Sequence, residues 1–292
     1  MKTNIVLALA LQLSAVALAQ TVSASASASI AAPQIVDVKS GDLHLKGYFW
    51  KPAAASGRGP FPAILFHHGS GGYDRQHTAG RTMAEAASDL APIFLKHGYA
   101  FLYVCRRGQG LSADQGPFTQ DLLKEAEAKG ADARRQLHYQ LITGSQLDDA
   151  LAGLRFLKAA RDVDPKRIAI VGHSFGGMLT LLSGDRANAI RAEVAFAAGA
   201  NSWQASPELR DRTLAAVRKT AAPIMLVYAA NDFDTTPGKD VSAELDRLHK
   251  SHVLKIYPAI GKTSDDGHSF LYLGIPEWEP DVFRFLDDNV KH

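Results

Sequence analysis

Cysteine is nearly absent from this sequence, and so are the common metal-binding motifs. Cys105 is the only cysteine among 292 residues, so no internal disulfide can form. Because Cys105 ends the apolar run 99–104, we expect a buried thiol rather than a reactive one. There is no cysteine cluster and no H-E-x-x-H pattern, and the adjacent His67 and His68 would point to opposite faces of a strand. The sequence therefore predicts no metal site.

A strong excess of one charge is also missing. The 32 lysines and arginines nearly balance 30 aspartates and glutamates, which leaves a formal net charge of +2 and no basic run. Nucleic-acid-binding domains concentrate lysine and arginine in a patch or stripe, so we expect no nucleic-acid partner. The hydrophobic content of 46% is typical of a globular domain with one large core.

The N-terminus has the pattern of an exported protein. Lys2 precedes the apolar stretch 5–18, and Ala17-Leu18-Ala19 offers a small-x-small cleavage site. The apolar stretch is too short for a membrane anchor, and no cysteine stands at the cleavage point to carry a lipid. We therefore predict export to the periplasm or the medium, with a signal peptide at 1–19 and an Ala/Ser-rich flexible linker at 20–33.

Residues 34–292 alternate between strand-like and helix-like segments. Apolar runs predict strands at 34–39, 43–51, 62–67, 99–104, 167–171, 191–197, 223–228 and 253–257. Helical spacing predicts helices at 82–97, 146–158, 178–182, 207–218, 239–249 and 279–290. This alternation is typical of an α/β domain with a mostly parallel sheet of about eight strands, an antiparallel first pair and helices on both faces.

Two long connections bear on access to a site. Segment 112–144 lacks strong periodicity, and we interpret it as a surface excursion beside the site. The connection 198–222 is short, so we expect no large lid domain there. In sheets of this kind the chemistry collects on loops at the carboxyl ends of the strands.

A serine lies between a predicted strand and a predicted helix. The apolar run 168–171 leads into Gly172-His173-Ser174-Phe175-Gly176, and the helix-compatible segment 178–182 follows. Such a sharp turn strains the serine backbone, requires small residues two places either side, and holds the hydroxyl clear of the sheet. A G-x-S-x-G pattern can arise by chance. Its place between strand and helix favours a nucleophile over a bystander serine in a glycine-rich turn.

The serine needs a base, usually a histidine that a carboxylate orients. In this type of fold the chain order is serine, acid, histidine. Asp232 follows the predicted strand 223–228, and its spacing from the strand end favours it over its rival Asp234. Either could cap the next helix, and Asp234 is better placed to do so. Among eleven histidines, His268 has the right order and lies at the right edge of the sheet.

The tetrahedral intermediate needs backbone N–H donors aimed at its oxyanion. The amide of Phe175 is the first candidate, and the glycine-rich loop 68–72 supplies the second, from Ser70 or alternatively Gly71. That loop lacks the Lys-Ser/Thr pair of a phosphate-binding loop. Aromatic candidates for lining an acyl or alcohol pocket are Tyr73, Trp203 and Phe233, although ordinary packing would explain each equally well.

Six motifs in order resemble the α/β-hydrolase superfamily, and more narrowly its dienelactone hydrolase and prolyl-oligopeptidase-like branch. They are His67-His68-Gly69-Ser70-Gly71-Gly72, Arg106-Arg107-Gly108-Gln109-Gly110-Leu111-Ser112, Val163-Asp164-Pro165, Gly172-His173-Ser174-Phe175-Gly176-Gly177, Asn231-Asp232 and Asp266-Gly267-His268. The resemblance spans about residues 40–290. It implies a serine hydrolase with Ser174, Asp232 and His268 as its triad and with no cofactor.

One departure limits what the resemblance implies. The archetypal dienelactone hydrolases use a cysteine nucleophile, whereas this chain has Ser174, so lactone specificity does not carry over. Peptidases of the branch usually bear an extra N-terminal domain that is not visible here. We therefore expect an exported serine esterase for small or medium carboxylic esters. A small-amide or peptide hydrolase is the alternative, and a non-catalytic binding protein would have lost one of the three residues.

Overall fold

The computed structural model describes residues 32–53, 59–71 and 74–292. The predicted signal peptide, nearly all of the predicted linker and the pocket candidate Tyr73 lie outside the described residues. Within the described part, no helix combines the length and the apolar character that crossing a membrane requires.

One eight-stranded sheet forms the centre of the domain, in the order β1-β2-β6-β3-β7-β8-β9-β10. The strands are β1 (Gln34–Ser40), β2 (Leu43–Trp50), β3 (Phe61–His67), β6 (Ala100–Val104), β7 (Val163–His173), β8 (Ala192–Phe196), β9 (Ile224–Ala229) and β10 (His252–Tyr257). Strand β2 runs antiparallel to both of its neighbours, and the remaining pairs are parallel. The predicted α/β fold with an antiparallel first pair is confirmed. A separate hairpin of β4 (His77–Thr78) and β5 (Arg81–Thr82) was not predicted.

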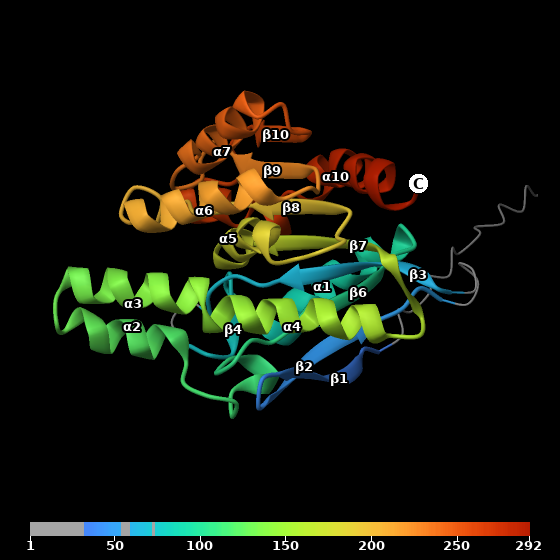
Figure 1. The fold of residues 1–292 in the computed structure, drawn as a ribbon, viewed down its shortest axis with the longest axis horizontal. Coiled ribbons are helices and arrows are strands. Elements are labelled where there is room, and N and C mark those ends of the chain that lie inside the picture. The colour runs from blue at the N-terminus through green and yellow to red at the C-terminus, as the bar shows by residue number, and fades with distance from the viewer. Residues whose placement is uncertain (1–31, 54–58, 72–73) are drawn as a thin grey trace, which may run out of the picture. The chain divides into compact units, whose positions relative to one another are not determined.

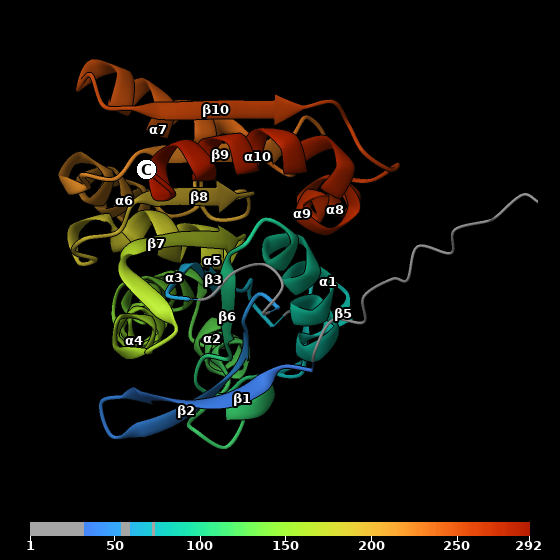
Figure 2. The same cartoon turned by 90° about the vertical axis from the view of Figure 1, so that its right-hand side faces the viewer.

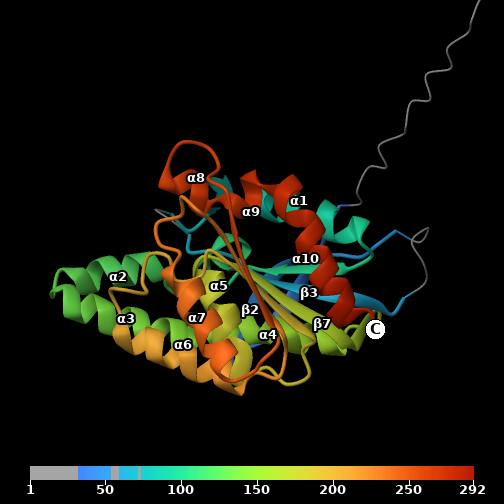
Figure 3. The same ribbon diagram turned by 90° about the horizontal axis from the view of Figure 1, so that it is seen from above.

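Helices cover both faces of the sheet (Figures 2 and 3). One layer consists of α4 (Ser145–Ala159), α5 (Phe175–Leu182), α6 (Pro207–Lys219) and α7 (Thr236–Arg247). The opposite layer consists of α1 (Met83–Lys96), α9 (Phe270–Leu273) and α10 (Ile275–Val290). The connection 198–222 holds only α6, in agreement with the expected absence of a large lid domain.

Strand β3 shows why the central strands are continuous apolar runs. Its side chains alternate between the two cores: Leu65 packs on the α4 and α5 side, whereas Ile64 and Phe66 pack on the α1 side. All three are fully buried. Because water reaches neither face, every position of the strand favours an apolar residue, and the sequence pattern is unbroken.

Segment 112–144 folds into a helical hairpin that the sequence pattern did not reveal. Helices α2 (Thr119–Glu127) and α3 (Ala131–Thr143) pack against each other and extend to the left in Figure 1. Ile142 is the only fully buried residue of α3. A helix with so narrow an apolar stripe leaves little periodicity in the sequence, because most of its positions face solvent.

Glu193 in β8 is a buried acid that makes the stability of the fold depend on pH. Its side chain is 0% exposed, Thr220 Oγ1 donates a hydrogen bond of 3.2 Å to Oε1, and burial raises the pKa of the carboxyl from 4.5 to about 8. Between these two values the folded protein holds a proton that the unfolded chain releases. The contribution of Glu193 to stability is therefore complete below pH 4.5 and is lost as pH rises to about 8.

We expect Glu193→Gln to remove this dependence, because the amide is neutral at every pH. The variant should match the wild type in melting temperature near pH 5. Its melting temperature should exceed that of the wild type near pH 8, because the free energy of unfolding of the wild type falls by about 1.4 kcal/mol for each pH unit of this window. Thermal unfolding followed by circular dichroism at several pH values measures the difference. A difference in melting temperature that does not change with pH would contradict the prediction.

Candidate active site

Ser174 stands at the turn between β7 and α5 in a strained backbone conformation. Its φ is +56° and its ψ is −117°, a region that residues with a side chain rarely adopt. The turn is held because the Ser174 N–H donates to the carbonyl of Phe196 at 2.9 Å, and the Ser174 carbonyl accepts from the Met178 N–H at 3.0 Å. This backbone conformation is the one found in the nucleophile elbow of α/β-hydrolases, a turn that holds the serine hydroxyl above the sheet.

The glycines two places either side of Ser174 are required by close backbone contacts. A Cβ atom on Gly172 would overlap the carbonyl of Gly176, and a Cβ atom on Gly176 would overlap the carbonyl of His67. The elbow therefore admits only glycine at these two positions. This is the physical reason for the G-x-S-x-G spacing in the sequence.

Ser174, His268 and Asp232 form a continuous hydrogen-bonded chain. Ser174 Oγ lies 2.8 Å from His268 Nε2, and His268 Nδ1 lies 2.7 Å from Asp232 Oδ1. The carboxylate accepts the proton on Nδ1, which leaves Nε2 free to accept the serine proton. The Asp232 side chain is 0% exposed and that of His268 is 14% exposed, so the acid is shielded while the base reaches the cavity. The structure brings together all three residues that the sequence singled out.

Asp234 is used for a different contact. Its Oδ1 accepts the Thr236 N–H at 2.8 Å at the start of α7, and its Oδ2 accepts from Gln204 Nε2 at 3.4 Å. Asp232 Oδ1, in contrast, accepts from both His268 and the Phe233 N–H. The choice of Asp232 over Asp234 therefore agrees with the geometry.

His268 is the last residue of the short helix α8 (Ser264–His268), where the sequence predicted a loop, and this segment is held from two directions. Asn231 Nδ2 donates to the carbonyls of Ile260 and Thr263 at 2.8 and 2.7 Å, which ties the acid loop to the histidine loop. The His173 ring donates from Nε2 to the backbone carbonyl of His268 at 2.7 Å. Burial lowers the pKa of His173 to about 3, so this ring stays neutral at physiological pH. Sequence reasoning missed the role of His173, although its place beside Ser174 was a signal.

Both candidate oxyanion donors lie beside Ser174. Helix α5 begins at Phe175, so the amide of Phe175 belongs to the first turn, whose N–H groups have no partner within the helix. Ser70 follows β3 and lines the same two cavities as Ser174.

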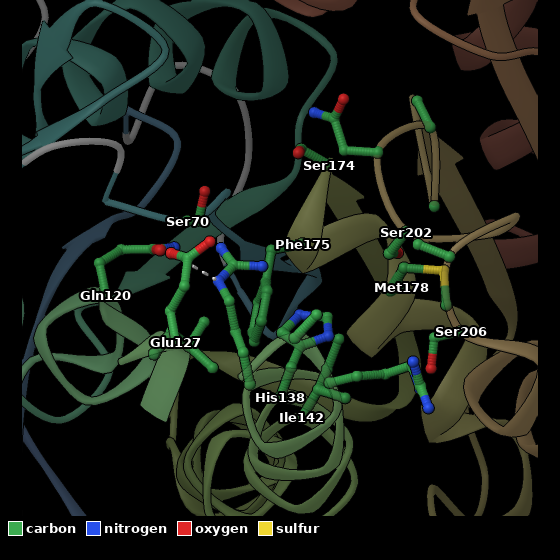
Figure 4. Close-up of a pocket in the computed structure, with 18 residues that line it drawn as sticks. Ser70, Gln120, Glu127, His138, Ile142, Ser174, Phe175, Met178, Ser202 and Ser206 are labelled. Atoms are coloured by element: carbon green, nitrogen blue, oxygen red, sulfur yellow. Dashed lines mark ion pairs between the residues drawn. The ribbon is translucent and has the colours of Figure 1, made fainter. Parts of the chain in front are cut away.

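The first cavity beside Ser174, of about 450 Å³, has residues of the α2–α3 hairpin as one wall (Figure 4). One face of α3 lines it with Ala131, Arg134, Arg135, His138 and Ile142, and Phe175, Met178 and segment 199–202 complete the wall. The two arginines are compensated by ion pairs, Arg134 with Glu127 at 3.5 Å and Arg135 with Asp132 at 2.8 Å.

The second cavity, of about 620 Å³, adjoins the first and shares Ser70, Gln120, Ser174 and Asn201 with it. His173, Phe233 and His268 line it together with Ser174 and Ser70. Phe233 is 42% exposed, and its ring centre lies 5.0 Å from that of His268, so the structure places this pocket candidate at the site.

Trp203, another pocket candidate, lies elsewhere. It is 1% exposed within the hydrophobic core, its Nε1 donates to Asp240 at 2.7 Å, and it does not line either cavity. The expectation that Trp203 lines a substrate pocket is therefore not met. A large apolar ring gains more from full burial in the core than from a cavity wall.

Residues for a metal centre are not grouped in the described ranges. No set of three or more His, Cys, Asp or Glu side chains there is arranged to hold an ion. Cys105 is fully buried, and burial raises the pKa of its thiol to about 11. A thiol of this kind has little thiolate at neutral pH.

The family model of the dienelactone hydrolases matches residues 45–273, a range that contains Ser174, Asp232 and His268. The chain belongs to the dienelactone hydrolase family. The resemblance inferred from the sequence motifs is confirmed at the level of the family.

Two curated relatives of this family member match about half of the chain. YtaP of Bacillus subtilis strain 168, a putative hydrolase, is 31% identical over 146 residues, which cover 48% of this chain and 44% of the relative. Esterase EstD of Thermotoga maritima is 29% identical over 160 residues, which cover 54% of this chain and 32% of the relative. The matched segment thus spans less than half the length of each relative.

Solved structures share the fold of this dienelactone hydrolase family member. The esterase Pf2001 of Pyrococcus furiosus superposes with a TM-score of 0.62 at 17% identity, over 88% of this chain and 91% of that chain. An acylaminoacyl peptidase of Pyrococcus horikoshii gives a TM-score of 0.62 at 18% identity, over 90% of this chain and 43% of that chain. At these identities the likeness shows the α/β-hydrolase fold alone.

Proposed function

We propose that this protein is an exported serine hydrolase that cleaves small or medium carboxylic esters through an acyl-enzyme. The observation that carries the proposal is the chain from Ser174 Oγ through the His268 ring to the buried Asp232 carboxylate, with its serine on a strained elbow. An esterase among the curated relatives supports the substrate class.

Each residue has a distinct role in the proposed reaction. Ser174 Oγ attacks the ester carbonyl carbon while His268 Nε2 takes the hydroxyl proton, and Asp232 stabilises the resulting imidazolium. The N–H groups of Phe175 and Ser70 hold the oxyanion of the tetrahedral intermediate. His268 returns the proton to the departing alcohol, which leaves an acyl group on Ser174. Water, deprotonated by His268, then attacks the acyl carbon; the bond to Ser174 Oγ breaks, His268 returns the proton to Oγ, and the carboxylic acid leaves.

The two cavities suit the two halves of an ester. The alcohol oxygen has to lie within reach of His268 Nε2, because that nitrogen supplies its proton. His268 lines the second cavity, so we assign the alcohol to that side. The acyl chain then points toward the first cavity, where Phe175, Met178 and Ile142 supply apolar surface. A volume of about 450 Å³ accommodates a short or medium acyl chain.

The function is tested by a series of p-nitrophenyl esters from acetate to octanoate and a matched p-nitroanilide. We expect ester turnover, a rapid first release of p-nitrophenol equal to the enzyme concentration, and an acylated Ser174 in the mass spectrum. Faster cleavage of the p-nitroanilide than of the matched ester would favour the amide or peptide hydrolase. No turnover of either by the folded protein would overturn the proposal.

Export rests on the N-terminal sequence pattern and is tested separately. We expect cell fractionation to find the mature chain outside the cytoplasm, with Gln20 as its first residue. Mass spectrometry of the purified N-terminus decides this, and an unprocessed chain in the cytoplasm would contradict it.

A further inference from the structure

Arg106 is a buried arginine that directly follows Cys105 at the end of β6. Its side chain is among the largest that are fully buried, and its residue is 2% exposed. The guanidinium donates from Nη1 to the carbonyl of His68 at 2.8 Å, from Nη2 to the carbonyl of Gly69 at 2.9 Å, and from Nε to Gln146 Oε1 at 2.9 Å. Two of its three contacts are thus on the backbone of the loop that carries Ser70.

The charged guanidinium of Arg106 donates its hydrogen bonds to neutral groups. Within the described residues its side-chain hydrogen bonds go to two carbonyls and an amide, while the buried carboxylate of Asp149 is taken by Arg107 at 2.7 and 2.8 Å. Burial lowers the pKa of Arg106 to about 10, so the guanidinium is still positive at neutral pH. The nearby Asp149 carboxylate favours the charged guanidinium, but the hydrogen bonds of that guanidinium are directed at Gln146 and at the backbone of the Ser70 loop.

The contact with Gly69 acts on the N–H of the next residue. The carbonyl of Gly69 and the N–H of Ser70 belong to one peptide group, and a donor on the carbonyl polarises the whole group. The ring of His68 donates to the same carbonyl from Nδ1 at 2.7 Å, while its Nε2 accepts the Arg106 N–H at 3.3 Å. Two donors therefore converge on the Gly69 carbonyl, and both strengthen the Ser70 N–H as a donor.

The same guanidinium also lies over the ring of Phe175. It lies 5.1 Å from the centre of the Phe175 ring, and the Phe175 amide is the first oxyanion donor. Arg106 thus contacts both segments that supply N–H groups to the reacting carbonyl.

We propose that Arg106 is a positioning residue of the oxyanion hole, which fixes and polarises the Gly69–Ser70 peptide group and makes Ser70, rather than Gly71, the second donor. The inference rests on the proposed ester hydrolysis and deepens it. The N–H of Gly71 belongs to the next peptide group, whose carbonyl is that of Ser70, and the contacts of Arg106 fall on the carbonyls before it.

The test compares Arg106→Met and Arg106→Lys with the matched control Arg107→Lys. Substrates are a p-nitrophenyl ester and its thionoester, in which sulfur replaces the carbonyl oxygen and accepts hydrogen bonds weakly. Loss of one whole oxyanion donor costs about 10²- to 10³-fold in kcat, so losing its polarisation should cost about 10- to 100-fold. We expect Arg106→Met to show this loss on the ester with KM nearly unchanged, and a much smaller loss on the thionoester.

Arg106→Lys keeps a positive donor, so its kcat on the ester should fall between those of the wild type and Arg106→Met. The lysine variant also tests the proposal if the methionine variant does not fold. Arg107→Lys keeps Asp149 paired and should leave the ester-to-thionoester ratio as in the wild type. If Arg106 had a purely structural role, the Arg106 variants would lose kcat by the same factor on the ester and on the thionoester, and that result overturns the proposal. Unchanged ester kinetics in a folded Arg106→Met protein also overturns it.

A fluorophosphonate probe separates this proposal from the proposed function. The probe forms a tetrahedral adduct on an activated serine and uses the oxyanion hole whatever the natural substrate is. A wild type that labels at Ser174 but does not turn over esters would refute the ester substrate, and the labelling rates of the Arg106 variants would then decide the present proposal. We expect those rates to fall by the same factor as kcat. A wild type that neither labels nor turns over would refute both.

Discussion

Replacing Ser174 by alanine is expected to lower kcat/KM for p-nitrophenyl butyrate by about 10⁵- to 10⁶-fold. The variant loses the only atom that can form the acyl-enzyme, while the His268 ring and the two cavities stay in place. The measurement is the steady-state rate of the purified variant against the wild type, with melting temperatures to show that both are folded.

His268→Ala provides the matched comparison. Triad residues act as a unit, so the double variant Ser174→Ala, His268→Ala should be no slower than either single variant. Losses that multiply in the double variant would mean that the two residues act independently, against the hydrogen bond of 2.8 Å between them. A Ser174→Ala protein that keeps a tenth of the wild-type activity would exclude Ser174 as the nucleophile.

Asp232→Asn is expected to lower kcat by about 10⁴-fold, while Asp234→Asn should leave it within about twofold of the wild type. An amide at position 232 can turn its NH₂ group toward His268 Nδ1, which then has to accept. The proton moves to Nε2, and the ring can no longer take the proton of Ser174. At position 234, the amide oxygen of asparagine still accepts the Thr236 N–H.

Each variant of this pair loses one carboxylate, and the two positions lie two residues apart, so general effects of losing a loop carboxylate cancel. Both are measured on the same ester, with KM reported beside kcat, because the carboxylate of Asp232 acts on the reaction and not on binding. Equal losses in the two variants would contradict the assignment of Asp232. A larger loss in Asp234→Asn would reverse it.

The elbow and the order of the triad could be read from the sequence because their physical causes are local. Gly172 and Gly176 are fixed by overlaps within the turn and with the neighbouring strand, and every such turn needs them. Strand β3 was visible because it is buried on both faces. Boundaries were less exact: helix α5 begins at Phe175 and α10 at Ile275, each three or four residues before the predicted start. The first turn of α5 contains Gly176 and Gly177, which are weak helix formers, and that of α10 contains a proline.

The α2–α3 hairpin and the placement of Trp203 could not be predicted. The hairpin buries little of its own surface, so its sequence has no strong period, yet it forms one wall of the cavity beside Ser174. Trp203 lies on a loop near the site in sequence, and only the packing around it puts the ring in the core and its Nε1 on Asp240.

The sequence by itself determined the fold class and singled out Ser174 and His268 as candidate nucleophile and base, because periodicity and a turn of fixed chemistry encode them within short segments. The tertiary structure decided what depends on residues far apart in the chain. It joins the predicted Asp232 to His268, and it places His173 on the His268 carbonyl and Arg106 on the loop of Ser70. These contacts span up to 95 positions along the chain, and no local pattern records them, since each exists only once the sheet has brought its strand ends together.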